Sequence, residues 1–119
     1  MGRRFDTAPM PEPFVLLGDF NLEANDPEYD YLVGPQDMEF KRLTSKENFI
    51  DTWVATGHGE DEGTTFSEKT SSNHIRDMRI DFAFVDESMQ KRIISARIDE
   101  QAQGSDHQPY WIEIDQELK

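Results

Sequence analysis

An apolar run that ends in two polar side chains constrains this chain more than any other feature. Residues 14–17 are all apolar, and residues 18–21 read Gly-Asp-Phe-Asn. A short apolar run of this kind predicts a buried strand over 14–20. In open α/β sheets ligands bind beyond the carboxyl ends of the strands, where Asp19 and Asn21 lie. If both residues continue the strand, their side chains share one face and could reach one ligand. An Asx-turn that ends the strand is the alternative interpretation.

Two further segments place ionisable side chains beside predicted strands. Asp81 lies within the apolar segment 79–85, and Asp106 and His107 precede the predicted last strand. A buried carboxylate needs a partner, because otherwise it is neutralised. His107 is the candidate partner, since an Asp can hold an imidazole in one tautomer and stabilise its charged form. A salt bridge between Asp81 and Arg79 is the competing interpretation, and the segment with His107 could be an exposed loop.

These three segments, in this order, resemble the C-terminal motif set of the endonuclease/exonuclease/phosphatase superfamily, the DNase I-like metal-dependent phosphoesterases. The resemblance implies an α/β fold with a mixed β-sheet and flanking helices, corresponding to half of a DNase I-like two-layer α/β sandwich. The length predicts one domain over 1–119, which by the resemblance is the C-terminal part of the family's domain, and three prolines predict an extended lead-in at 1–13. The implied activity is hydrolysis of a phosphodiester or phosphomonoester with Mg²⁺ or Mn²⁺, in a nucleic acid or a small phosphorylated molecule.

The resemblance also implies roles for single residues. Asp19 would bind metal or activate the attacking water, and Asn21 would steady the nucleophile and the phosphoryl group. Asp81 would orient His107, which would contact the scissile phosphate, and Asp106 would belong to the metal site. Whether the acid or the histidine is the general base stays open. Weaker correspondences imply substrate contacts from two further residues, Thr65 and Arg79.

Composition limits the chemistry and the partners. The chain of 119 residues has no cysteine, so any metal would be held by oxygen ligands or histidine, which suits Mg²⁺ or Mn²⁺. A net charge of −13 argues against tight sequence-independent DNA binding, although Lys41-Arg42 or Arg76 with Arg79 could hold one phosphate. We see no apolar stretch long enough for a membrane span and no signal segment, and we therefore expect a cytoplasmic protein.

The resemblance covers only the C-terminal half of the family's fold. The metal-binding Glu of the N-terminal half cannot be placed, because only 13 residues precede the first predicted strand. We therefore expect an incomplete site, which a homodimer or a missing N-terminal half could complete. A non-catalytic or truncated relative that acts as an association module is the alternative. A calcium-binding structural domain has only the acidity in its favour.

Local patterns predict the remaining elements. Pro27 after Asn-Asp predicts a helix start, and Gly34 predicts its end. The polar segment 44–47, followed by apolar residues at helical spacing, predicts a second helix that includes Ile50. Further expectations are an exposed His58 and His74, a mobile acidic loop at 57–63, a short strand at 64–66, an irregular segment at 67–77, a turn or short helix at 86–91, and strands at 93–98 and 109–115.

Overall fold

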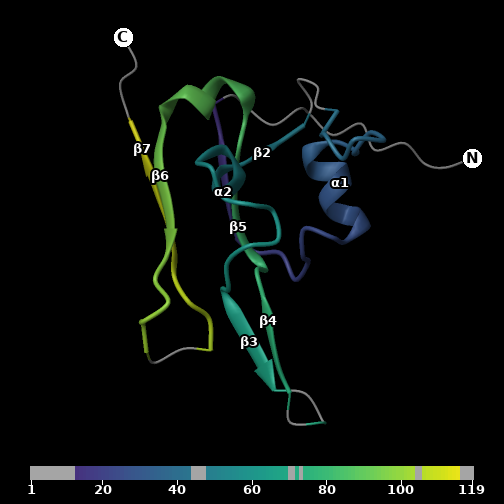
Figure 1. The fold of residues 1–119 in the computed structure, drawn as a ribbon. Helices are drawn as coiled ribbons and strands as arrows, with labels where there is room; N and C mark the ends of the chain where they lie inside the picture. Colours follow the sequence, from purple (N-terminus) through teal and green to yellow (C-terminus); the bar gives the residue numbers. More distant parts are fainter. Residues whose placement is uncertain (1–12, 44–47, 70–71, 73, 104–105, 116–119) are drawn as a thin grey trace, which may run out of the picture.

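The computed structural model describes residues 13–43, 48–69, 72, 74–103 and 106–115 (Figure 1). Within these residues the chain forms short strands and short helices, in the following order: β1 (Val15–Asp19), α1 (Pro27–Val33), β2 (Ile50–Asp51), α2 (Thr52–Ala55), β3 (Phe66–Lys69), β4 (Ile75–Met78), β5 (Asp81–Val85), the 3-10 helix η1 (Glu87–Arg92), β6 (Ile93–Ile98) and β7 (Tyr110–Ile114). The expected strands at both ends of the chain and the helix that begins at Pro27 are therefore present. None of the helices in the described residues is long and apolar enough to cross a membrane.

Strand β5 is the centre of a three-stranded sheet with the order β1-β5-β2. Both of its neighbours pair with it antiparallel. All four residues from Phe82 to Val85 are buried, so the strand is covered on both faces, which accounts for its nearly continuous apolar sequence. The predicted α/β class with a sheet and flanking helices is confirmed, and the pairings within the described residues are antiparallel.

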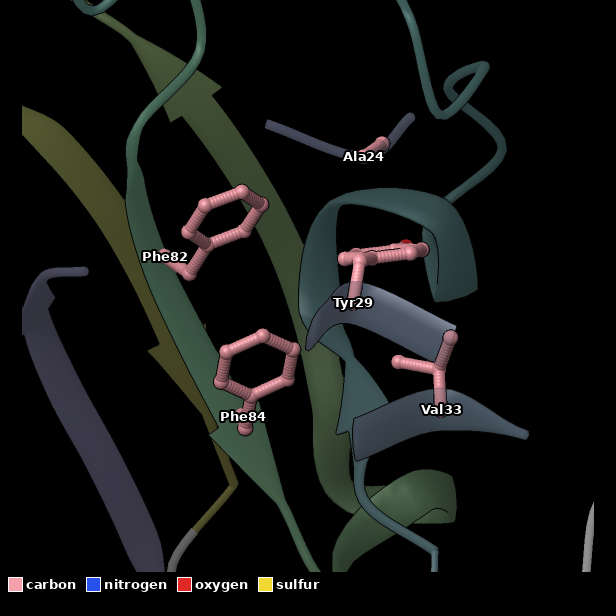
Figure 2. Close-up of a cluster of buried hydrophobic side chains, with 5 residues drawn as sticks. All are labelled: Ala24, Tyr29, Val33, Phe82 and Phe84. Carbon is pink, nitrogen blue, oxygen red and sulfur yellow. The ribbon is translucent and has the colours of Figure 1, made fainter. Parts of the chain in front are cut away.

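Helix α1 covers one face of this sheet. Phe82 and Phe84 alternate with the residues of the other face and point toward Tyr29 and Val33 (Figure 2). The rings of Tyr29 and Phe82 lie 6.0 Å apart between centroids. Each buried side chain of this size stabilises the fold by about 1.5–3 kcal/mol relative to an exposed one. Gly34 ends the helix at φ +100°, where a Cβ would lie 2.5 Å from a backbone oxygen.

Helix α2 and the β6–β7 hairpin also contact β5. In Figure 1, α1 and the hairpin stand on opposite sides of β5. The Thr52 hydroxyl of α2 donates to the carbonyl of Ala83 at 2.8 Å, and it lies 2.6 Å from the hydroxyl of Tyr110 in β7. This arrangement of helix, sheet and hairpin is compatible with part of an α/β sandwich.

Two expectations about local structure are wrong. Residues 67–77 are not irregular throughout, because β3 and β4 pair antiparallel within them. The predicted second helix is interrupted, since Ile50 and Asp51 form β2 against β5 and only 52–55 are helical. The predicted start of that helix, 44–47, lies outside the described residues. Asp51 instead begins α2 by accepting a hydrogen bond from the backbone amide of Trp53 at 3.0 Å.

Candidate active site

The antiparallel register of β1 and β5 brings two carboxylates together. Asp19 is the last residue of β1 and Asp81 is the first residue of β5, and the two are direct partners in the ladder. Residues opposite one another in an antiparallel pair project their side chains to the same face. Two like charges at this spacing repel each other unless a cation lies between them. The register thus creates a small site of negative potential at one end of the sheet.

His107 supplies a basic group to this site. Its Nδ1 atom lies 2.7 Å from Oδ2 of Asp81, and its Nε2 atom lies 3.6 Å from Oδ2 of Asp19. The hydrogen bond to Asp81 raises the pKa of His107, burial lowers it, and the charges of Asp81, Asp19 and Asp106 raise it further, so that the net pKa lies above the usual value. The site therefore favours the imidazolium form.

The loop before β7 is held so that His107 reaches the sheet. His107 forms an isolated antiparallel bridge with Phe66, the first residue of β3, and the two rings lie 4.9 Å apart. The amide of Gln108 donates to the carbonyl of Thr65 at 2.7 Å. The expected pairing of Asp81 with His107 is present in the structure. The contact of Phe66 with His107 could not be predicted from the sequence, because the two residues are 41 positions apart and no local pattern links them.

Asp19 also closes a turn, as the alternative interpretation of its motif required. Its Oδ1 atom accepts a hydrogen bond from the amide of Asn21 at 2.9 Å, while Oδ2 faces His107. Asn21 has a φ of +52°, a region that Asn tolerates better than most residues. The expectation that Asp19 and Asn21 share one strand face is therefore wrong, because Asn21 lies beyond β1 in a left-handed turn.

The other expected site residues do not belong to the cluster of Asp19, Asp81 and His107. Asp106 is exposed and stands outside the cluster of Asp19, Asp81 and His107. Thr65 is fully buried, so the expected direct substrate contact does not fit its position. Arg79 is also buried, and its Nη2 atom lies 3.0 Å from a carboxylate oxygen of Asp51 rather than beside Asp81.

The two arginine clusters considered for phosphate binding contain arginines that are paired with carboxylates. Arg42 forms ion pairs with Asp30 and Glu60, which anchors the acidic loop that we expected to be mobile. Arg76 pairs with Glu23, so neither arginine presents the simple basic patch considered from the sequence.

His58 also differs from expectation. It is half-buried rather than exposed, since its ring stacks on Trp53 with 3.6 Å between centroids. His74 is exposed, as expected.

A hollow of about 390 Å³ opens beside the cluster. It is lined by strand residues and by the loop before β7, namely Leu17, Gly18, Asp81, Phe82, His107, Gln108, Pro109 and Tyr110. A larger cavity of about 480 Å³ lies between α1 and α2, and three of its charged residues, Arg42, Asp51 and Glu60, already contact other side chains. The smaller hollow is therefore the candidate substrate site, because Asp81 and His107 line it.

The donor set of the cluster fits a hard divalent cation. One ligand atom each from Asp19, Asp81 and His107 lies within 4.8 Å of the others. The two carboxylates are ligands that both Mg²⁺ and Mn²⁺ accept, and His107 could join them only in its neutral form. Among the described residues, this is the one group of His, Asp and Glu side chains with such spacing.

Comparison with protein families agrees with this geometry. The model of the Endonuclease/Exonuclease/phosphatase family matches residues 3–107. The chain belongs to this family. Its members act on phosphate-ester bonds and generally depend on divalent metals. The terms hydrolase, endonuclease, exonuclease and phosphatase therefore describe the family to which the chain belongs. Comparison with the curated proteins and with the solved structures gave no match.

Proposed function

We propose that this chain carries a site for metal-dependent hydrolysis of phosphate esters, either diesters or monoesters. The observation that carries the proposal is the contact of one imidazole with two facing carboxylates, at distances of 2.7 Å from Asp81 and 3.6 Å from Asp19. A bound Mg²⁺ or Mn²⁺ would supply positive charge for the phosphate and would lower the pKa of water. Asp19, at the open end of the cluster, and Asp106 beyond it are the carboxylates proposed to hold it.

Each of three residues would then have a separate role in the reaction. Asp81 accepts the Nδ1 proton of His107, fixes the ring orientation and stabilises the imidazolium. The Nε2 atom of His107, which lies 3.6 Å from Asp19, would donate to a phosphoryl oxygen as charge develops there. Asn21, in the turn closed by Asp19, is proposed to contact the phosphoryl group or the nucleophile.

Small phosphorylated molecules are the substrates that we propose first, ahead of long nucleic acids. The net charge of −13 repels a polyanion at long range. The arginines considered for phosphate binding are engaged with carboxylates, as Arg42 is with Glu60 and Arg76 is with Glu23. A single phosphate group at the cluster meets less of this repulsion than a strand that crosses the whole surface.

The test is hydrolysis of bis-p-nitrophenyl phosphate and p-nitrophenyl phosphate, each with Mn²⁺, Mg²⁺ or EDTA. We expect metal-dependent turnover, and His107→Ala should lower kcat/KM by about 100-fold or more. His58→Gln is the matched control, since His58 is a half-buried histidine outside the cluster that stacks on Trp53. Turnover that survives in His107→Ala, or that does not depend on a metal, would contradict the proposal.

An association role is the second candidate function, and a specific surface favours it. β1 is an outer strand of its sheet, and Leu17 on it is 62% exposed beside the hollow. An outer strand with an apolar side chain can pair with another chain. We propose that a second copy of the chain could cover this strand and complete the site. The solution mass should then exceed that of one chain at micromolar concentration, and Leu17→Asp should reduce it; a monomer at all concentrations would refute this role.

A further inference from the structure

Thr65 makes contacts that suit it to a task other than touching substrate. The residue is fully buried, immediately before β3. Its hydroxyl oxygen accepts hydrogen bonds from two successive amides, those of Ile80 at 3.0 Å and Asp81 at 3.2 Å. Its own amide donates to the carbonyl of Met78 at 2.8 Å. Three hydrogen bonds thus connect Thr65 to the short junction between β4 and β5, which ends at Asp81.

The same residue is tied to the segment that carries His107. The Thr65 carbonyl accepts a hydrogen bond from the amide of Gln108 at 2.7 Å. Phe66, the next residue, forms the antiparallel bridge with His107 and packs its ring against the imidazole at 4.9 Å between centroids. Thr65 and Phe66 therefore stand between two segments that are distant in sequence and that each supply one partner of the 2.7 Å contact between Asp81 and His107.

We propose that Thr65 is a positioning residue, which fixes Asp81 relative to His107 by holding the backbone of both segments. Its hydroxyl accepts from the amides of Ile80 and Asp81 at the point where the ladder with β1 begins. Removing that acceptor would leave two amides without it, and the junction would shift to find another partner. A shift of about 1 Å in a reacting group can lower a rate by about 100-fold.

The test compares Thr65→Val, which keeps the shape and removes the hydroxyl, with Thr65→Ser, which restores the hydroxyl. Thr52→Val is the matched control, because Thr52 is also fully buried and its hydroxyl also joins β5 to the β7 region, through Ala83 and Tyr110. One readout is kcat and KM on the phosphodiester. The other is the proton NMR signal of the His107 Nδ1–H group in the metal-free protein, which reports the hydrogen bond to Asp81 without any substrate.

We expect Thr65→Val to lower kcat by about 100-fold with KM changed by less than about threefold, and to shift or broaden the Nδ1–H signal. Thr65→Ser should return both readouts toward wild type, and Thr52→Val should leave both near wild type. A Thr65→Val protein whose Nδ1–H signal is unchanged, or whose kcat equals that of Thr52→Val, overturns the positioning role.

The kinetic arm rests on the proposed function, whereas the NMR arm does not. A wild-type protein without turnover would refute the proposed function, and the Nδ1–H signal of the variants would still decide whether Thr65 fixes the contact. If Thr65→Val does not fold, Thr65→Cys takes its place in both readouts, because a thiol of similar size is only a weak acceptor.

Discussion

Arg79 is the residue for which structure and family resemblance lead to opposite predictions. A substrate-binding arginine would be accessible, and its loss would raise KM with little effect on stability. In the structure the Arg79 side chain is 4% exposed, its Nη2 atom lies 3.0 Å from Asp51, and its Nε and Nη2 atoms donate to the carbonyl of Glu60 at 3.2 Å and 2.8 Å. The guanidinium also lies 4.5 Å from the ring centre of Phe82. This environment predicts a structural role.

The magnitude for Arg79→Met follows from these contacts. Breaking a buried ion pair by removing one partner costs about 3–5 kcal/mol, because the other charge is left uncompensated. Here that charge is Asp51, which would keep the hydroxyl of Tyr29 at 2.7 Å and the amide of Trp53 as donors among the described residues. We therefore expect Arg79→Met to lower the free energy of unfolding by about 4 kcal/mol. Adding Asp51→Asn should recover part of this loss, since it removes the uncompensated charge.

Urea denaturation followed by tryptophan fluorescence measures this effect. At a slope of about 1.5 kcal/mol per molar urea, a loss of 4 kcal/mol lowers the midpoint by about 2.7 M. Arg76→Met is the matched control, because Arg76 is an arginine paired with Glu23 but its side chain is 56% exposed, and we expect it to cost less than about 1 kcal/mol. Equal midpoints for the Arg79 and Arg76 variants would refute the structural role. If Arg79→Met does not fold at all, Arg79→Lys gives the comparison instead.

Three further predictions concern separate parts of the molecule. Burial acts to raise the pKa of Asp86, but hydrogen bonds from Ser88 and from the amide of Phe14 outweigh it, so the folded pKa lies below the usual value. The stability that this carboxylate contributes is present above about pH 4 and is lost as the pH falls through the folded pKa. The difference in urea midpoint between wild type and Asp86→Asn should therefore shrink on acidification. A difference that stays constant with pH would contradict this prediction. Phe40 is exposed at a φ of +63°, and Phe40→Asn should raise the free energy of unfolding by about 1 kcal/mol, whereas an unchanged midpoint would argue against backbone strain there. Asp19→Asn should weaken Mn²⁺ binding, measured by calorimetry, by about 10-fold or more, and undiminished affinity would remove Asp19 from the metal site.

The elements that could be predicted are those whose local pattern is strong. The apolar runs of β1 and β5 and the proline and glycine that bound α1 specify those elements within a few residues. The β3–β4 hairpin could not be predicted in the same way. Its residues are largely exposed and polar, so no alternation marks a buried face, and its pairing depends on backbone hydrogen bonds and on contacts such as Ser67 with Asp77 at 2.6 Å.

β2 was missed for a different reason. Ile50 lies in an apolar pattern that fits one helix face, and a two-residue strand has no periodicity of its own. Its pairing with Val85, 35 positions along the chain, overrides the local helical preference.

The sequence by itself determined which chemical groups this protein can use, because the carboxylates, the imidazole and the absence of cysteine are fixed by residue identity. It also determined the family, since the family model matches residues 3–107 of the sequence. Only the tertiary structure decided which of these groups meet. The register of β1 on β5 places Asp19 opposite Asp81, and the contacts of Thr65 and Phe66 bring His107 to them. The physical reason is that hydrogen bonds and side-chain packing between distant segments set distances to within an ångström, whereas local propensity sets only the course of each segment.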